Sequence, residues 1–204
     1  LSITKDASAI VTAQTLSNST IMVTEGESSI QISEITKGAT RNDGSGGIAW
    51  VGNRDIVFSS QGGGSVNLWV SGFEESKSKQ ITFGATSNYT PAVDLVRGDI
   101  YYVSADDKLP HIWRMKFDGG NPEQITSAED YNPDVSSDGR WLTFDSWKSG
   151  SRSIWKKKIG SKDSATLLRS GASKPKFSPD GRFVVCKFYD EKEVRERMAV
   201  INFA

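Results

Sequence analysis

The sequence has little of the chemistry on which most catalytic and metal sites depend. It holds one cysteine, Cys186, and one histidine, His111, among 204 residues. A disulfide within the chain is therefore excluded, and so is a zinc site built from the usual cysteine and histidine ligands. The nucleophile signature Gly-x-Ser-x-Gly is also absent, so a hydrolase triad centred on His111 is not expected.

The chain also lacks an excess of charge and a long apolar run. Its 25 Lys and Arg balance 25 Asp and Glu, whereas nucleic-acid-binding proteins usually carry a basic excess. No stretch approaches the roughly 20 apolar residues of a membrane-spanning helix. We therefore expect neither nucleic-acid binding nor membrane insertion. The 36% hydrophobic content, together with 19 Gly, is typical of short strands joined by many turns.

What the sequence does contain is a repeat. Successive copies begin 46, 44, 42 and 42 residues apart, at Leu1, Gly47, Pro91, Pro133 and Pro175. The third position of each copy is apolar: Ile3, Ala49, Val93, Val135 and Phe177. The tenth is aliphatic: Ile10, Ile56, Ile100, Leu142 and Val184. A period of this length is typical of propeller blades, whose copies pack face to face.

A second landmark lies near the middle of each copy. It is a large side chain: Met22, Trp69, Trp113, Trp155 and Met198. We expect these side chains to be buried between neighbouring sheets. Each copy predicts four short strands, so the fold class is an all-β propeller of four-stranded antiparallel blades. About five blades are present, and the last lacks its outer strand.

The repeat predicts one propeller over residues 1–204. Its blades fall at approximately 1–46, 47–90, 91–132, 133–174 and 175–204. Because the fifth copy stops after its third strand, an open sheet edge is expected there. We therefore predict a fragment of a larger propeller, or self-association of two chains through the open edge.

These motifs resemble the TolB-type, WD-repeat-like propeller repeats of bacteria. The residues that carry the resemblance are Ser178-Pro-Asp-Gly181, Ile112-Trp113, Asp118-Gly-Gly120 and Gln124-Ile-Thr126. The resemblance implies a rigid, non-catalytic platform that binds a protein or peptide and needs no cofactor. A single cysteine is compatible with cytoplasm or periplasm, and we expect a periplasmic or otherwise extracytoplasmic bacterial location.

A second, narrower similarity concerns propellers attached to bacterial serine/threonine kinases. Arg41-Asn-Asp-Gly44 followed by Gly47-Ile-Ala-Trp50 carries it. No kinase motif occurs in the sequence. This similarity implies a sensory or accessory region of a larger protein.

The loops that lead into the innermost strands ring one mouth of the expected channel. Tyrosine combines apolar area with a polar tip and is favoured at interfaces. The expected partner-binding residues are Arg41, Asn42, Asp43, Asn88, Tyr89, Asp130, Tyr131, Asn132 and Lys174. The alternative is that Tyr89 and Tyr131 pack beneath their loops against the following prolines.

Two acids on innermost strands, Asp94 and Asp134, are expected to face the central channel. Residues two apart share a face of a strand, and this places both acids opposite the apolar third position. A pair of channel carboxylates could serve glycoside hydrolysis or bind a cation through oxygen. The simplest reading is a hydrated channel wall.

Overall fold

The structure is a computed structural model. It describes residues 2–3, 10–11, 18–25, 31–34, 36, 41–72, 78–106, 109–190 and 193–203. These residues form strands and turns but no helix, and therefore no helix that could span a membrane.

The strands form six antiparallel sheets, which follow one another along the chain. Two of them have two strands: β1 (Ser2–Ile3) with β2 (Ile10–Val11), and β3 (Met22–Glu25) with β4 (Gln31–Glu34). The first four-stranded sheet has β5 (Ile48–Val51), β6 (Asp55–Gly63), β7 (Ser65–Gly72) and β8 (Lys79–Gln80). The second has β9 (Ser87–Asp94), β10 (Asp99–Ala105), β11 (Pro110–Lys116) and β12 (Glu123–Gln124).

A third four-stranded sheet and a three-stranded sheet complete the chain. The former has β13 (Asp130–Val135), β14 (Trp141–Ser146), β15 (Ser153–Lys158) and β16 (Thr166–Ser170). The latter has β17 (Ala172–Phe177), β18 (Phe183–Asp190) and β19 (Arg195–Asn202). The predicted fold class is confirmed, including the missing outer strand of the last sheet.

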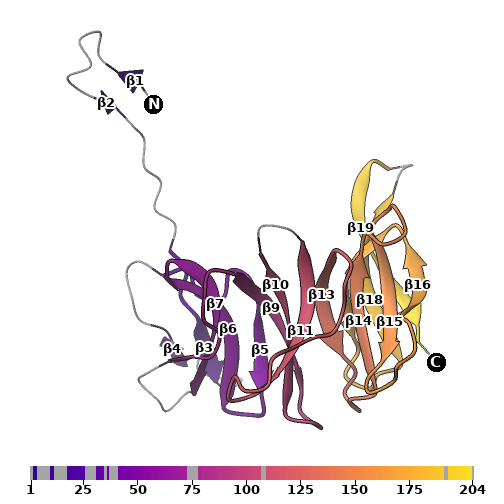
Figure 1. Cartoon of the computed structure of the whole chain (residues 1–204), viewed down its shortest axis with the longest axis horizontal. Coiled ribbons are helices and arrows are strands. Elements are labelled where there is room, and N and C mark those ends of the chain that lie inside the picture. Colours follow the sequence, from indigo (N-terminus) through magenta and orange to yellow (C-terminus); the bar gives the residue numbers. More distant parts are fainter. Residues whose placement is uncertain are drawn as a thin grey trace.

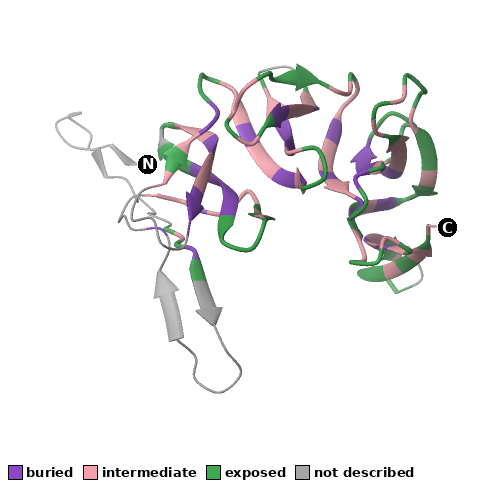
Figure 2. Cartoon of the chain, turned by 90° about the horizontal axis from the view of Figure 1, so that it is seen from below, coloured by how far each residue is buried: buried purple, intermediate pink, exposed green. Residues whose placement is uncertain are grey.

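The sheets stand face to face in an arc, with their strands nearly parallel to the arc's axis (Figures 1 and 2). The first strands of successive sheets, β5, β9, β13 and β17, contact each other in turn and lie innermost. In the described residues, contacts between the larger sheets run from each sheet to the next one along the chain. β1 and β2 lie apart from the arc, so the first copy does not form a single sheet in the described residues (Figure 1).

Each sheet inside the arc is buried on both faces, because it has a neighbour on either side. One strand residue faces the following sheet and the next residue faces the preceding one. Leu68, Ile112 and Ile154 pack on the following sheet and are fully buried. Trp113 and Trp155 pack on the preceding sheet and are half-buried.

The predicted burial of the large landmark residues is thus correct only in part. Met22 is 59% exposed and Met198 is 64% exposed. Met22 stands at the start of β3, on the side where the described residues place no preceding sheet. Met198 pairs with Lys187 as Ile154 pairs with Asp145, so it occupies the position that faces a following sheet. Ala199, opposite Cys186, holds the place of the tryptophans.

The threonine that closes the first three copies has a structural role. Its hydroxyl accepts a hydrogen bond from the backbone N–H of the third strand, and this compensates for the very short fourth strand. Thr82 accepts from Leu68 at 2.8 Å and Thr126 accepts from Ile112 at 3.0 Å. In the first copy, Thr36 accepts from Ile21 at 3.0 Å. Ile21 also packs on Phe58 in the next sheet.

A bulge interrupts three successive innermost strands at the same place. Thr90, Asn132 and Lys174 each precede a proline and have φ angles of 47°, 48° and 54°. The pairing of each strand with its neighbour shifts at this point. A positive φ is unfavourable for residues other than glycine, so each bulge is a strained feature that the surrounding sheet holds in place.

Candidate partner-binding surface

The candidate surface lies where the innermost strands begin, just before their bulges. Tyr89 on β9 and Tyr131 on β13 occupy the same repeat position in adjacent sheets, and both are half-buried. Lys174 on β17 is exposed. With Asn132 and Arg152, these residues form what we call the mouth surface. The bulges turn the strand at this point in all three sheets.

Tyr131 is fixed by polar contacts on two sides. Its hydroxyl donates a hydrogen bond to Glu129 Oε1 at 2.8 Å. The guanidinium of Arg152 lies 5.3 Å from the ring centroid, within reach of a cation–π interaction. Burial, the Glu129 carboxylate and nearby Tyr89 raise the pKa of Tyr131 to about 12. The phenol therefore remains protonated and uncharged at physiological pH.

Asp145 on β14 links this surface to the next sheet. Its Oδ1 accepts from the Asn132 side-chain amide and from the Lys174 backbone N–H, both at 2.9 Å. Its Oδ2 pairs with Arg152 Nε at 2.5 Å. The carboxylate is fully buried, so these contacts compensate for its desolvation and fix the positions of three mouth-surface residues.

Three of the predicted partner-binding residues are buried: Asp43, Asn88 and Asp130. Asp43 accepts from Arg41 Nε at 3.1 Å. The Asn88 amide donates to Asn67 Oδ1 at 3.2 Å and to the Thr86 carbonyl at 3.1 Å. The Asp43 and Asn88 side chains therefore have structural contacts inside the protein.

The other two predicted residues of the first loop are Arg41 and Asn42, which lie in the first copy. The Arg41 guanidinium stacks 4.4 Å from the Trp69 ring centroid, and Arg41 is half-buried. Asn42 forms an isolated β-bridge with Ser19. Arg41 therefore joins the first copy to the sheet β5–β8, whereas Asn42 pairs within the first copy.

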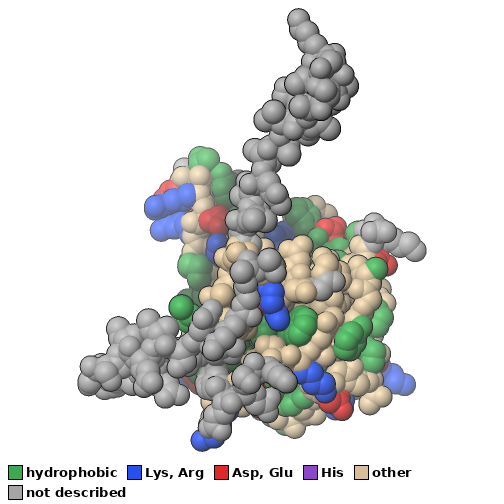
Figure 3. Space-filling view, turned by 90° about the vertical axis from the view of Figure 1, so that its left-hand side faces the viewer, with side chains coloured by type: hydrophobic (Ala, Val, Ile, Leu, Met, Phe, Trp, Pro, Cys, Tyr) green, Lys and Arg blue, Asp and Glu red, His purple; other side chains and the backbone are tan. Residues whose placement is uncertain are grey.

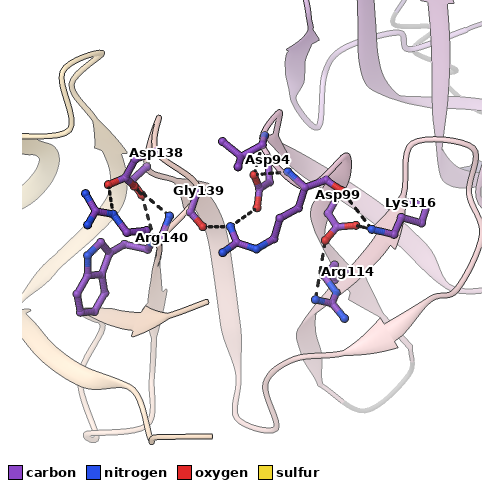
Figure 4. A network of polar contacts seen from close by, with 11 residues as sticks. Asp94, Asp99, Arg114, Lys116, Asp138, Gly139 and Arg140 are labelled. Atoms are coloured by element: carbon purple, nitrogen blue, oxygen red, sulfur yellow. Dashed lines mark hydrogen bonds and ion pairs between the residues drawn. The ribbon is translucent and has the colours of Figure 1, made fainter. Parts of the chain in front are cut away.

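Asp94 does not stand free in a channel. It is buried at the end of β9, where Oδ1 accepts from the backbone N–H groups of Val96 and Arg97 at 3.0 and 3.1 Å. Its Oδ2 pairs with Arg97 Nη1 at 3.1 Å, and the same nitrogen donates to the Gly139 carbonyl of the next sheet (Figure 4). The carboxylate thus holds a turn and ties two sheets together.

Asp134 has a different neighbour. Its Oδ1 pairs with Lys176 Nζ at 2.8 Å, and its Oδ2 accepts from the Phe177 backbone N–H at 2.7 Å. Burial raises the pKa of Asp134, while the contacts with Lys176 and Phe177 act in the opposite direction. The two acids are thus bonded to separate partners, Asp94 to Arg97 and Asp134 to Lys176.

Comparison with known proteins agrees with the propeller fold. The model of the TolB beta propeller domain matches residues 26–204. The chain belongs to this family.

Individual relatives match smaller parts of this TolB-type propeller. An uncharacterized protein of Agrobacterium fabrum is 33% identical over 93 residues, which are 44% of this chain and 32% of the relative. The Tol-Pal system protein TolB of Desulfosudis oleivorans is 36% identical over 58 residues, 28% of this chain and 13% of the relative. The chain thus matches a third or less of the length of these curated relatives.

A solved structure shows the same fold. TolB from Acinetobacter baumannii superposes with a TM-score of 0.75 at 16% identity, over 90% of this chain and 46% of that one. At this level of identity the similarity concerns the fold alone.

The sequence did not single out three residues of this TolB-type propeller that the structure brings to the mouth surface. Glu129 and Arg152 hold Tyr131, and Trp147 beside them is 45% exposed. Trp147 and Arg152 lie between β14 and β15, where the copies differ in length and sequence. The only signal in the sequence for this part of the surface was Trp147, an aromatic residue directly after the second strand of its copy.

The reactive residue types have structural roles. Cys186 is buried against Ile154 and Ala172, and burial raises the pKa of its thiol. His111 Nδ1 lies 2.8 Å from the Ala128 carbonyl, so this nitrogen carries the hydrogen. The described part of the chain has no group of three or more His, Cys, Asp or Glu suited to a metal ion.

Proposed function

We propose that this TolB-type propeller is a non-catalytic platform that binds a protein or peptide at the mouth surface. The observation that carries the proposal is the pair of half-exposed tyrosines at one repeat position of adjacent sheets. Tyr89 is close enough to Tyr131 to affect its pKa. Rigid aromatic side chains offer contact area at low entropic cost, which makes such pairs suitable anchors for a partner.

The charges around the tyrosines also suit a protein partner. Arg152 and Lys174 provide positive charge, and both contribute, after Lys187, to lowering the pKa of Glu196 on β19. Trp147 adds an exposed aromatic ring. A surface that combines aromatic area with charges of both signs matches the composition of protein interfaces better than that of a substrate pocket.

The proposal is tested with the full chain immobilised against a bacterial envelope extract, followed by quantitative mass spectrometry of captured proteins. Replacing both Tyr89 and Tyr131 by alanine is expected to lower capture about tenfold or more, as for interface anchors. Tyr189→Ala serves as the matched control, because Tyr189 is 55% exposed on β18 and is not part of the mouth surface.

The thermal midpoint of each variant separates lost binding from lost structure. We expect the double variant to retain most of its thermal stability, since both rings are only half-buried. Equal capture by the wild type and the double variant would place any partner site elsewhere. A collapse of the thermal midpoint would assign the tyrosines to packing, which is the alternative raised by their neighbouring prolines.

Two finer features belong to the same proposal. We propose that the platform acts outside the bacterial cytoplasm as a sensory or accessory part of a larger protein, on the basis of its resemblance to TolB. We also propose that the arc is part of a larger propeller with blades at about 1–46, 47–90, 91–132, 133–174 and 175–204. The attachment of a kinase domain stays a prediction of the sequence.

The exposed ends of the arc support the proposal of self-association. On the last sheet Met198 and Val200 are 64% and 67% exposed, on the strand whose outer edge has no partner strand in the described residues. Exposed hydrophobic side chains also occur on the face at the other end of the arc (Figure 3). Trp50 on β5 is 52% exposed. A second chain could cover these faces. Analytical ultracentrifugation would show a concentration-dependent dimer that Met198→Lys abolishes.

A further inference from the structure

A small pocket lies between the sheets β9–β12 and β13–β16. It has a volume of about 220 Å³, and Ile125, Asp130, Phe144, Lys148, Trp155 and Lys157 are among its lining residues. Asp130 itself is only 2% exposed. The pocket thus combines an apolar wall with a buried carboxylate, an indole and two lysines.

The repeat supplies an internal comparison, because an equivalent pocket lies one sheet earlier. It is lined by Ile81, Asn88, Tyr102 and Trp113, at the positions of Ile125, Asp130, Phe144 and Trp155. There the polar end is satisfied within the protein. Asn88 donates to Asn67 Oδ1, which also accepts from the Thr82 hydroxyl at 3.0 Å.

In the Asp130 pocket the corresponding bonds are missing. His111 stands at the position of Asn67, but its Nδ1–H donates to the Ala128 carbonyl at 2.8 Å. Within the described residues, Asp130 Oδ1 and Trp155 Nε1 are buried without a hydrogen-bond partner. A buried polar group without a partner is costly, and a buried charge more so. The Asp130 pocket therefore has an unmet need for both a donor and an acceptor.

The neighbouring lysines decide which ligand meets both needs. Lys148 Nζ lies 5.2 Å from the Trp155 ring centroid. Lys157 Nζ is already bonded to the Asp163 carbonyl at 2.6 Å. A simple cation would satisfy Asp130 but would leave the indole unpaired and face Lys148. A simple anion would satisfy Lys148 and the indole but would face the Asp130 carboxylate.

We propose that the Asp130 pocket binds a free α-amino acid. The ammonium group pairs with Asp130, and the carboxylate accepts from the Trp155 indole and from Lys148. The side chain packs against Ile125 and Phe144, which favours an apolar amino acid of medium size. A pocket of about 220 Å³ is smaller than the roughly 300–1,000 Å³ of sites for larger ligands, and this agrees with a ligand of amino-acid size.

The test uses the full chain labelled with ¹⁵N and follows the indole N–H resonances during titration with L-leucine. The Trp155 resonance, assigned with Trp155→Phe, is expected to shift saturably with a dissociation constant of about 1 mM or lower. Leucinamide lacks the carboxylate and N-acetyl-leucine lacks the ammonium. Each is expected to bind about tenfold or more weakly, because each loses one charge-assisted contact.

Two variants locate the site. Asp130→Asn keeps the shape of the side chain and is expected to weaken leucine binding about tenfold, since it removes the partner of the ammonium. Asn88→Ser, at the equivalent position of the preceding pocket, is expected to leave leucine binding unchanged. The double replacement of Tyr89 and Tyr131 should also leave it unchanged, which separates this proposal from partner binding at the mouth surface.

Three results would overturn the proposal. The first is the absence of a saturable shift with leucine up to about 20 mM, far above the expected dissociation constant. The second is equal binding of leucine and its two blocked analogues. The third is unchanged leucine affinity in Asp130→Asn.

Discussion

Asp145 offers the sharpest test of how the sheets are held together. Its buried carboxylate accepts from Asn132 and the Lys174 N–H and pairs with Arg152. Asp145→Ala would leave all three donors without their acceptor. Two of them belong to the sheet that contains Asp145, and the third belongs to the next sheet.

The expected loss follows from these contacts. Hydrogen bonds to a charged group contribute about 1.5–3 kcal/mol each. The ion pair between Asp145 and Arg152 should contribute at the low end of this range, because the Arg152 side chain is 35% exposed and solvent screens it. Since such terms do not add fully, we expect a loss of about 3–5 kcal/mol in the free energy of unfolding, the range for breaking a buried ion pair. Asp145→Asn keeps one acceptor oxygen, so its loss should be about 1–2 kcal/mol.

Urea unfolding followed by tryptophan fluorescence measures these losses. Lys187→Ala is the matched control, because Lys187 stands at the same repeat position in the last sheet. There it forms only an exposed pair with Glu196 at 3.0 Å, so its removal should cost less than about 1 kcal/mol. If Asp145→Ala cost no more than this control, water would satisfy the three donors as well as Asp145 does. The inferred link between the sheets would then be wrong.

Two further predictions concern packing and pH. Ile112→Ala should cost about 3–4 kcal/mol in urea unfolding because Ile112 is fully buried. Trp113→Ala should cost less than the roughly 3–5 kcal/mol of a fully buried aromatic residue. A larger loss for Trp113→Ala than for Ile112→Ala would contradict the assigned faces of β11. The hydrogen bond from Ser136, with other contacts, lowers the pKa of Asp138 from 3.8 to about 2. Its contribution to stability is therefore present at neutral pH and is lost as pH falls from about 4 towards 2. A carboxyl ¹³C titration with a midpoint near 3.8 would refute this.

The repeat in the sequence was sufficient to predict the architecture, because every sheet uses the same strand order and similar turns. Ile56, Ile100, Leu142 and Val184, at the tenth position of their copies, are all buried. This position lies in the second strand, which has a strand on each side. A pattern that many contacts enforce at once is readable from the sequence alone.

The residues between the sheets were predicted less well. The tryptophans were expected to fill the space between blades, but the fully buried position is the aliphatic residue before each of them, such as Ile112 before Trp113. Both residues face a neighbouring sheet, but the larger tryptophan extends towards the more solvent-exposed outer part of its own sheet. Met198 was assigned to the wrong position because the β18–β19 hairpin is two residues longer than the β14–β15 hairpin. The tryptophan position therefore falls at Ala199, and Met198, one residue before it, lies on the other face of β19.

The candidate site depended on contacts that no repeat pattern contains. An aspartate at the end of an inner strand can face the axis or bond to its own turn. Asp94 does the latter, because Val96 and Arg97 present their N–H groups to it. Arg152 and Glu129 come from loops and meet at Tyr131 only in the folded chain. Such side-chain contacts are determined by the tertiary structure and not by the spacing of residues in the repeat.

The arrangement of contacts along the arc has a mechanical consequence. Since the larger sheets in the described residues pack on their immediate neighbours in chain order, the arc is a linear array. A force applied at the two ends of such an array loads its sheets in series. Extension would therefore release sheets one at a time from an end, with the three-stranded sheet β17–β19 a natural first step, and a pulling trace would show separate steps instead of one rupture.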